Sequence, residues 1–402
     1  MPGRRAIVAA LHGASERFVR ELNAPTDRAP DWNEFEWRAA MAVAVMHGVS
    51  GLLAERLRWR GPALWQDFLA EQLRQGVLRE QRVRSLLSQL DAAAKKAGIP
   101  LMALKGSAIL DMGLYAPGVR PQSDIDLLCR PGDEATAARV IESLGYEEGD
   151  TSWKHVDFVP TGQGADRIFG EHIGNPHKVE LHVRIAERLP RREVQVELLR
   201  PNAQAGLNGY VSGGALLKHL LLHAAGNLSV RSGRLIQLHD IALLCRSLRS
   251  EALSSAFGTT ATPWWAWPAL ALAERCFPGS VEPSVLGQAA AACPWWLRRQ
   301  VMARSLEEVS LVDPRILAMP ALAWADDFGA ALEYAWRQLV PDRESTQLRR
   351  TTAPRQAMTA GSSWSVQPQW LRVLRWLLAR PLRVLTMYSL RTACSYMPAA
   401  RP

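Results

Sequence analysis

Two aspartates separated by one residue, Asp124 and Asp126, lie inside the short apolar run "SDIDLLCR" at residues 123–130. In a β-strand alternate side chains point to the same face, so both carboxylates would project together. Two neighbouring carboxylates repel each other unless a cation lies between them, and oxygen ligands of this kind suit Mg²⁺. The pattern therefore predicts a metal site on this strand.

A third carboxylate, Glu180, lies in a second strand-like run, "KVELHVRI" at residues 178–185. The same two-residue period puts His182 and Arg184 on the face of Glu180, where they could contact an acceptor or orient the metal ligands. Carboxylates from two strands could hold one or two ions that clamp a phosphoryl group during in-line displacement. An isolated Asp-x-Asp is common near strand ends, so the interpretation depends on all three carboxylates.

A phosphate-binding turn is predicted at Lys105-Gly106-Ser107, where the apolar run "IPLMAL" gives way to the helical pattern "SAILDMGLY". Backbone N–H groups at the start of a helix attract anions, glycine lets a phosphate approach closely, and the serine hydroxyl adds a donor. Lys105 and Arg120 are the nearest basic residues and could neutralise a triphosphate or a departing pyrophosphate. The plainer alternative is a tight turn with a helix cap.

The order of these motifs resembles the nucleotidyltransferase superfamily that includes DNA polymerase β. More narrowly, "LKGSAIL", "LYAPGVRPQSDIDLLCRPGD", "LGY" and "VELHVRI" are similar to a bacterial group named only as an uncharacterised nucleotidyltransferase family. The resemblance covers roughly residues 35–250. Sixteen residues separate Ser107 from Asp124, which is longer than the superfamily usually has but similar to the narrower family.

The resemblance implies transfer of a nucleoside monophosphate from a nucleoside triphosphate such as ATP to an acceptor, with release of pyrophosphate. The resemblance also implies a role for each matching residue. Gly106 and Ser107 would hold the triphosphate, and Asp124 and Asp126 would bind Mg²⁺ or Mn²⁺. Glu180 would bind metal or activate the acceptor hydroxyl. The acceptor could be a small hydroxylated molecule, a peptide or protein, or an RNA end. Resemblance to genes that accompany bacterial peptide and exopolysaccharide assembly favours a peptide or a sugar. The alternative is a catalytically inactive protein that keeps the nucleotide-binding fold and binds a membrane or a partner.

Two histidines, His219 and His223, could pair on a metal because they are four residues apart on a predicted helix. They lie among leucines and lack an accompanying H-E-x-x-H motif, so structural packing is favoured. His239 and Asp240 are likewise expected to orient helices.

The order of helix and strand patterns around these residues predicts an α+β fold. It would consist of a small mixed sheet of polymerase-β-like nucleotidyltransferase type with helical N-terminal and C-terminal regions. Apolar residues at spacings of three and four predict helices over 33–59 and 67–98, and Gly98 is a stop signal. Strands are expected in "IPLMAL", "SDIDLLCR", "WKHVDFVP" and "KVELHVRI". The predicted regions are 1–98, helical; 99–200, catalytic; 201–344, helical; and 345–402, a polar linker with a basic amphipathic tail.

The positive charge of the chain is concentrated in that tail. Nine arginines and no acidic residue follow Glu344, and they account for the whole formal net charge of +9, which leaves residues 1–344 formally neutral. The tail could pack on the protein, lie on an anionic membrane surface or contact an acidic partner, and nucleic acid stays open although no binding module is recognised. Pro381 should kink or divide the tail helix.

The remaining composition points to a cytoplasmic protein, with peripheral attachment to the inner membrane as the alternative that the tail leaves open. No window reaches about 18 uninterrupted apolar residues, and the N-terminus has an amphipathic helix pattern rather than that of a signal sequence. The five cysteines are scattered and lack C-x-x-C spacing, which favours reduced packing thiols over disulfides or a zinc site.

Overall fold

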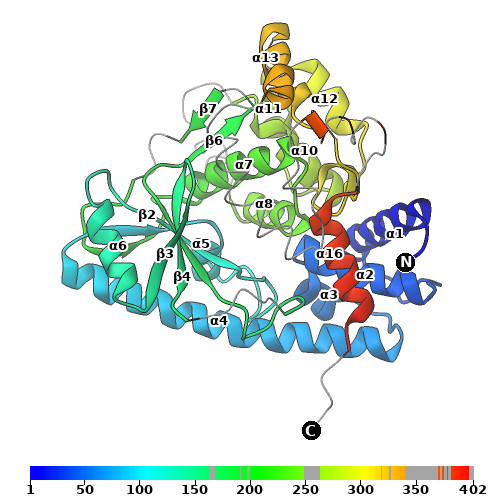
Figure 1. The fold of residues 1–402 in the computed structure, drawn as a ribbon, viewed down its shortest axis with the longest axis horizontal. Helices are drawn as coiled ribbons and strands as arrows, with labels where there is room; N and C mark the ends of the chain where they lie inside the picture. Colours follow the sequence, from blue (N-terminus) through cyan, green and yellow to red (C-terminus); the bar gives the residue numbers. More distant parts are fainter. Residues whose placement is uncertain are drawn as a thin grey trace.

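The computed structural model of the chain contains a six-stranded mixed sheet flanked by helices, which confirms the predicted α+β class (Figure 1). The predicted linker at 345–367, Pro381 and seven of the nine tail arginines lie outside the residues that the structure describes. The described residues are 1–162, 168–190, 192–196, 200–248, 263–317, 319–325, 327–340, 370–371, 374, 378 and 382–397.

Four helices precede the sheet: α1 (Arg4–Asn23), α2 (Glu34–His47), α3 (Ser50–Arg56) and α4 (Ala63–Ala97). The prediction of one helix over 33–59 is wrong, because Gly48 adopts a left-handed conformation with φ of 68° and ends α2. Gly98, with φ of 70°, ends α4 as predicted. No described helix is by itself long and apolar enough to cross a bilayer; α2 and α3 meet that criterion only as a pair bent by 112°.

The central sheet has the strand order β3-β4-β5-β2-β1-β8. The pairs β2–β5 and β1–β8 are parallel and the other neighbours are antiparallel. All four expected strands are present, whereas β3, β8 and the separate antiparallel pair β6–β7 were not predicted. The strands are β1 (Pro100–Ala103), β2 (Asp124–Leu128), β3 (Tyr146–Thr151), β4 (His155–Pro160), β5 (Lys178–His182), β6 (Ala186–Leu189), β7 (Arg192–Gln195) and β8 (Gly206–Asn208).

The two faces of the sheet have different chemistry. One face is apolar: Ile125 and Leu127 of β2 and Val179 of β5 pack in a buried cluster with residues of α4 and of α6 (Glu134–Glu142). Figure 1 shows α4 running along the lower side of the sheet. Because side chains alternate along a strand, Asp124, Asp126 and their neighbours on β5 project from the opposite face. The core thus fixes which residues reach that face.

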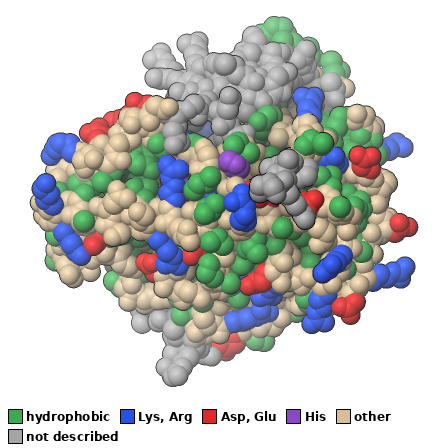
Figure 2. All heavy atoms as spheres, turned by 90° about the horizontal axis from the view of Figure 1, so that it is seen from below, with side chains coloured by type: hydrophobic (Ala, Val, Ile, Leu, Met, Phe, Trp, Pro, Cys, Tyr) green, Lys and Arg blue, Asp and Glu red, His purple; other side chains and the backbone are tan. Residues whose placement is uncertain are grey.

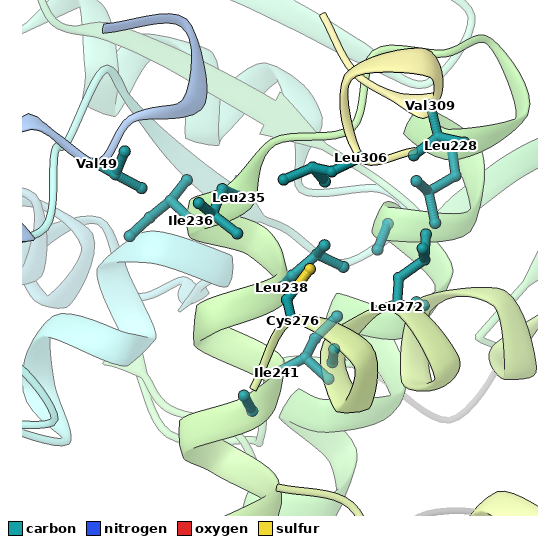
Figure 3. Close-up of a cluster of buried hydrophobic side chains, with 14 of the residues drawn as sticks. Val49, Leu228, Leu235, Ile236, Leu238, Ile241, Leu272, Cys276, Leu306 and Val309 are labelled. Carbon is teal, nitrogen blue, oxygen red and sulfur yellow. The ribbon is translucent and has the colours of Figure 1, made fainter. Parts of the chain in front are cut away.

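Helices α7 (Gly213–Ser229) and α8 (Leu235–Ser247) lie opposite the polar face of the sheet, and α10 (Ala266–Cys276) packs on both of them. The helices α11 (Pro283–Ala292), α12 (Trp295–Met302) and α13 (Phe328–Leu339) follow, and α11 and α12 pack on α10. Figure 3 shows part of their buried core, in which Leu238 and Ile241 of α8 lie near Leu272 and Cys276 of α10. The same core extends through α1, α2 and the start of α4, so the N-terminal and C-terminal helices share one apolar interior. The five cysteines are unpaired, and four of them are buried.

The last helix that the structure describes packs on this body. Helix α16 (Val384–Ser395), red in Figure 1, lies against α2, and its Leu390 and Ala393 are fully buried. The Arg383 guanidinium donates to the carbonyl oxygens of Arg231 and Ser310, whereas Arg391 is exposed. These two arginines therefore do not share one solvent-facing basic surface. Membrane attachment through the rest of the tail stays a prediction.

Charges of both signs are interspersed over the face of the molecule drawn in Figure 2, with Lys and Arg side chains lying among Asp and Glu. This distribution agrees with the formal neutrality of residues 1–344.

A close contact between α4 and the loop before β2 gives the first testable prediction. A Cβ on Gly76 would overlap the carbonyl oxygen of Gly118, whereas a Cβ on Gly287, inside α11, would meet nothing within 4 Å. Gly76→Ala should therefore cost about 1–3 kcal/mol of unfolding free energy, because the backbone must shift. Gly287→Ala should gain about 0.5–1 kcal/mol from helix propensity. Urea denaturation of both variants checks this, and equal effects would contradict the contact.

Candidate active site

The polar face of the sheet brings the three predicted carboxylates together. In the parallel pairing of β2 with β5, Asp126 lies opposite Glu180 and Asp124 lies opposite Lys178. Asp126 is 4% exposed, and Asp124 and Glu180 are half-buried. Three acidic side chains therefore share one patch where β2 and β5 run side by side.

Lys105 reaches into this patch from the end of β1. Helix α5 (Lys105–Asp111) begins directly after the strand, and the Lys105 Nζ donates to Asp126 Oδ1 at 2.6 Å. The Lys105 backbone has a positive φ of 45°, and its N–H donates to the Tyr210 hydroxyl at 3.2 Å. The Tyr210 hydroxyl lies 2.6 Å from Nδ1 of His219. His219 therefore supports this tyrosine, in line with the structural role predicted for it.

The charges in the patch act on one another. Burial and the neighbouring charges of Asp126 and Glu180 raise the pKa of Asp124. Burial also opposes ionisation of Asp126, but the Lys105 ammonium and His182 outweigh it and hold the pKa of Asp126 well below its ordinary value. Burial disfavours the charged Lys105 ammonium, yet Asp126, Glu180 and Asp124 together raise its pKa. The patch therefore contains three carboxylates and the Lys105 ammonium, and the charge of each group affects the pKa of its neighbours.

The turn after β1 leaves room for glycine alone. A Cβ on Gly106 would lie 2.7 Å from Nη1 of Arg120 and 2.8 Å from Oε1 of Gln122. Gln122 donates through Nε2 to the Gly106 carbonyl oxygen at 3.1 Å, which ties this turn to the residues just before β2. Gly106 therefore lines the cavity with the Arg120 and Gln122 side chains packed directly against it.

Arg120 is held by an ion pair that the sequence did not indicate. Its Nε and Nη2 donate to the two carboxylate oxygens of Asp240 at 2.9 and 2.8 Å. The Tyr115 hydroxyl donates to Asp240 at 2.6 Å and lies 2.8 Å from Nδ1 of His239. His239 and Asp240 therefore orient Arg120 and connect α8 to the sheet domain, and only the Nη1 end of Arg120 points toward Gly106.

A cavity of about 420 Å³ lies between the polar face of the sheet and helices α7 and α8. Six predicted residues line it: Lys105, Gly106, Arg120, Asp124, Asp126 and Glu180. The far wall is formed by polar residues of α7 and α8 together with Leu311 and Leu385, so α16 also borders the cavity.

The other three predicted residues lie elsewhere. His182 is behind the wall, with Nε2 3.1 Å from Asp126 Oδ1. Ser107 is 1% exposed and is not part of the cavity lining, and its hydroxyl has no hydrogen-bond partner. Arg184 follows the end of β5, is exposed, and donates to the Trp153 carbonyl oxygen at 3.5 Å.

A second polar cluster, which was not predicted from the sequence, lies at the edge of the cavity. Lys154 donates to Glu187 Oε1 at 2.9 Å, and the same oxygen lies 3.4 Å from Nδ1 of His223. Asn227 lies one turn further along α7, with Nδ2 3.1 Å from Nε2 of His223. Burial lowers the pKa of His223, so this imidazole is neutral and its Nε2 accepts the Asn227 hydrogen bond. Of this cluster, Lys154, His223 and Asn227 line the cavity.

The chain is similar to a known protein family and to a solved structure. A family model described as "Uncharacterised nucleotidyltransferase" matches residues 33–278, which is more than half of the chain. The chain is also similar to a solved structure titled as that of the antibiotic-resistance factor ANT(2'')-Ia, with 16% identity and a TM-score of 0.31, over 44% of this chain and 90% of that one. No curated protein sequence matches the chain.

Proposed function

The chain belongs to the uncharacterised nucleotidyltransferase family, and from this membership we propose that it transfers a nucleoside monophosphate from a nucleoside triphosphate to a nucleophilic acceptor. The bond between the α- and β-phosphates breaks, a bond from the acceptor oxygen to the α-phosphorus forms, and pyrophosphate leaves. The observation that carries this proposal is the placing of Asp124, Asp126 and Glu180 on one cavity wall beside Lys105 and Gly106.

The donor set of this wall fits a divalent cation of the kind that the reaction needs. Asp124, Asp126 and Glu180 offer carboxylate oxygens, which are the ligands that Mg²⁺ and Mn²⁺ prefer. The raised pKa of Asp124 has burial and two neighbouring carboxylates as its main causes, so added positive charge would favour its ionised form. Bound there, the metal would neutralise phosphate charge and polarise the α-phosphate.

Lys105 and Gly106 have the positions needed for the triphosphate. Gly106 lines the cavity and has no side chain of its own to hinder an anion, and the Nη1 end of Arg120 lies beside it. We propose that Lys105, which pairs with Asp126, contacts the phosphates and stabilises the departing pyrophosphate. Glu180 lies on the cavity wall beyond Asp126 and is the residue proposed to accept the acceptor hydroxyl proton, in addition to its role as a metal ligand.

The acceptor would enter on the side of α7, where Lys154, His223 and Asn227 provide hydrogen-bonding groups. This wall suits a hydroxylated acceptor, and a sugar or a peptide remains preferred over an RNA end. The test separates cell extract into a low-molecular-weight filtrate and a dialysed protein fraction, each incubated with α-³²P-labelled triphosphates, Mg²⁺ and the protein. Labelled product from the filtrate supports a small acceptor; label only on protein or RNA would contradict it.

The alternative is a catalytically inactive nucleotide-binding protein that acts through its tail. It differs in one outcome: it would bind a nucleoside triphosphate but release no pyrophosphate with any extract fraction. The complete set of three carboxylates favours the enzyme.

Gly106→Ala should weaken triphosphate binding by about tenfold or more, because the new methyl group meets Arg120 and Gln122 at less than 3 Å. Both neighbours are anchored, Arg120 by Asp240 and Gln122 by the Gly106 carbonyl, so neither can simply turn away. Calorimetric titration with a non-hydrolysable ATP analogue measures the effect. Gly209→Ala is the control, since a Cβ there meets nothing within 4 Å. Equal affinity of the two variants would remove Gly106 from the phosphate site.

A further inference from the structure

We propose a second cation site beside the three carboxylates, in which His155, Glu180 and His182 bind a transition-metal divalent ion such as Mn²⁺, Co²⁺ or Zn²⁺ in preference to Mg²⁺. Each of these residues offers one ligand atom, and the three atoms lie within 4.8 Å of one another. The catalytic meaning of this site rests on the proposed function, but its metal binding can be measured without nucleotide or acceptor.

Strand pairing builds the site. β4 and β5 are antiparallel, with His155 opposite His182 and Asp157 opposite Glu180. Because alternate residues share a face, the imidazoles of His155 and His182 project from the same face as the Glu180 carboxylate. The two imidazole rings lie 4.9 Å apart between centroids. Three side chains on two paired strands are thus directed to one point.

The distances suit a shared ion. Oε2 of Glu180 lies 3.6 Å from Nδ1 of His155 and 3.6 Å from Nε2 of His182. Ligand atoms bound to one ion by bonds of about 2.1 Å at angles of about 90–110° are about 3.0–3.5 Å apart. Oε2 of Glu180 is therefore within a few tenths of an ångström of ligand spacing from each nitrogen, and the two nitrogens lie within 4.8 Å of each other.

The other contacts of His155 match those of a metal ligand. Its Nδ1 is buried and has no hydrogen-bond partner among the described residues, so it offers a lone pair toward Glu180. Its Nε2 lies 3.0 Å from Oδ1 of Asp157, and Lys178 in turn donates to Oδ2 of Asp157 at 3.0 Å. The contact places a carboxylate behind the ring, which is the arrangement that commonly supports metal-binding imidazoles.

His182 links this site to the carboxylates. Its Nε2 lies 3.1 Å from Asp126 Oδ1, and an ion bound to Nε2 has to replace that contact. The exchange is favourable because the cation would face the Asp126 carboxylate directly. The ligand set then contains two nitrogens and carboxylate oxygens, which suits Mn²⁺, Co²⁺ and Zn²⁺ better than Mg²⁺, an ion that keeps its water and prefers oxygen.

The test uses full-length protein without nucleotide and the metal ions alone. Mn²⁺-loaded wild-type protein should show ¹⁴N couplings from imidazole in pulsed EPR, and Co²⁺ should bind with visible d–d absorption that a hundredfold excess of Mg²⁺ does not remove. In His155→Gln the Co²⁺ affinity should fall at least tenfold, and in His155→Gln/His182→Gln the nitrogen couplings should disappear. His12→Gln is the matched control, because His12 also lies near a carboxylate, Glu307 at 3.7 Å, but outside the cavity.

Absence of nitrogen coupling in the wild type, or unchanged Co²⁺ affinity in His155→Gln, would overturn the proposal. The wild-type spectrum decides the question even where a variant fails to fold. Failure of the proposed function is distinguishable: nitrogen-coupled metal in a protein that consumes no triphosphate would retain this site and reject the transferase. Triphosphate consumption without nitrogen-coupled metal would do the opposite.

Discussion

Asp124→Asn should abolish triphosphate consumption, by about a thousandfold or more, without loss of stability. The carboxylate is a proposed metal ligand, and loss of one such group from the reacting centre costs several kcal/mol of transition-state stabilisation. Its ionised form is disfavoured in the fold, since burial, Asp126 and Glu180 raise its pKa. A neutral amide removes that repulsion, so the unfolding free energy should stay within about 0.5 kcal/mol of the wild type or increase.

The pH dependence follows from the direction of this shift. A raised carboxyl pKa means that the folded state is stabilised below the ordinary value of 3.8 and loses that contribution as pH rises. Any stability advantage of Asp124→Asn should therefore be present at pH 7 and vanish near pH 3.8. Asp126→Asn should lose activity equally but cost about 3 kcal/mol, since it leaves the buried Lys105 ammonium without its partner.

Pyrophosphate release and chemical denaturation measure these two properties separately. Asp111→Asn, at the exposed end of α5, is the control and should change neither. Full activity in Asp124→Asn would exclude the proposed metal ligand. A large loss of stability in the same variant would instead contradict the account of repulsion among the carboxylates.

Arg79→Met should lower the unfolding free energy by about 3–5 kcal/mol, because it leaves a half-buried carboxylate and three carbonyl oxygens without their donor. Arg79, on α4, is 3% exposed and donates to Glu171 Oε2 at 2.6 Å. It also donates to three carbonyl oxygens, those of His172, Asn175 and Gln122, at 2.7–2.9 Å. One guanidinium therefore holds the loop before β5 and the residue two positions before Asp124.

This penalty should depend on pH. Burial raises the pKa of Glu171 even with Arg79 present, and removal of the guanidinium takes away the charge that opposes this shift. Protonation of Glu171 relieves the variant at low pH, so the loss should be larger at pH 8 than at pH 5. Denaturation at both pH values checks this. Arg74→Met, which removes an exposed arginine paired with Glu71 on the same helix, should leave the denaturation midpoint unchanged. Equal losses of stability in both variants would contradict the role of Arg79.

The strands that carry the acidic residues could be predicted because local pattern and buried face agree. In β2 and β5 apolar residues alternate with charged ones, and the apolar positions form the buried face that the core requires. β3, "YEEGDT", has no such alternation because it is an edge strand whose last five residues are exposed. β8 has three residues and is defined by its pairing with β1 about a hundred positions earlier. Such elements depend on the assembled fold.

The residues of the candidate active site divide in the same way. Asp124, Asp126 and Glu180 follow from a two-residue period, and the same period in "HVDFV" would have indicated His155 and Asp157 had it been applied to β4. The ion pair between Arg120 and Asp240 could not be predicted from the sequence, because it joins positions 120 residues apart. The burial of Arg383 was missed for a similar reason: its carbonyl acceptors belong to other helices and turns of the fold.

The position of the broken phosphate bond tests the central claim most directly. The protein is incubated with Mg²⁺, active extract and a triphosphate labelled with ³²P at the α-phosphate or, in a parallel reaction, at the γ-phosphate. Nucleotidyl transfer predicts that α-label enters the acceptor product and γ-label is released as pyrophosphate, with both lost in Asp124→Asn. Entry of γ-label into the acceptor, or release of γ-label only as inorganic phosphate, would contradict the assignment of this site to nucleotidyl transfer.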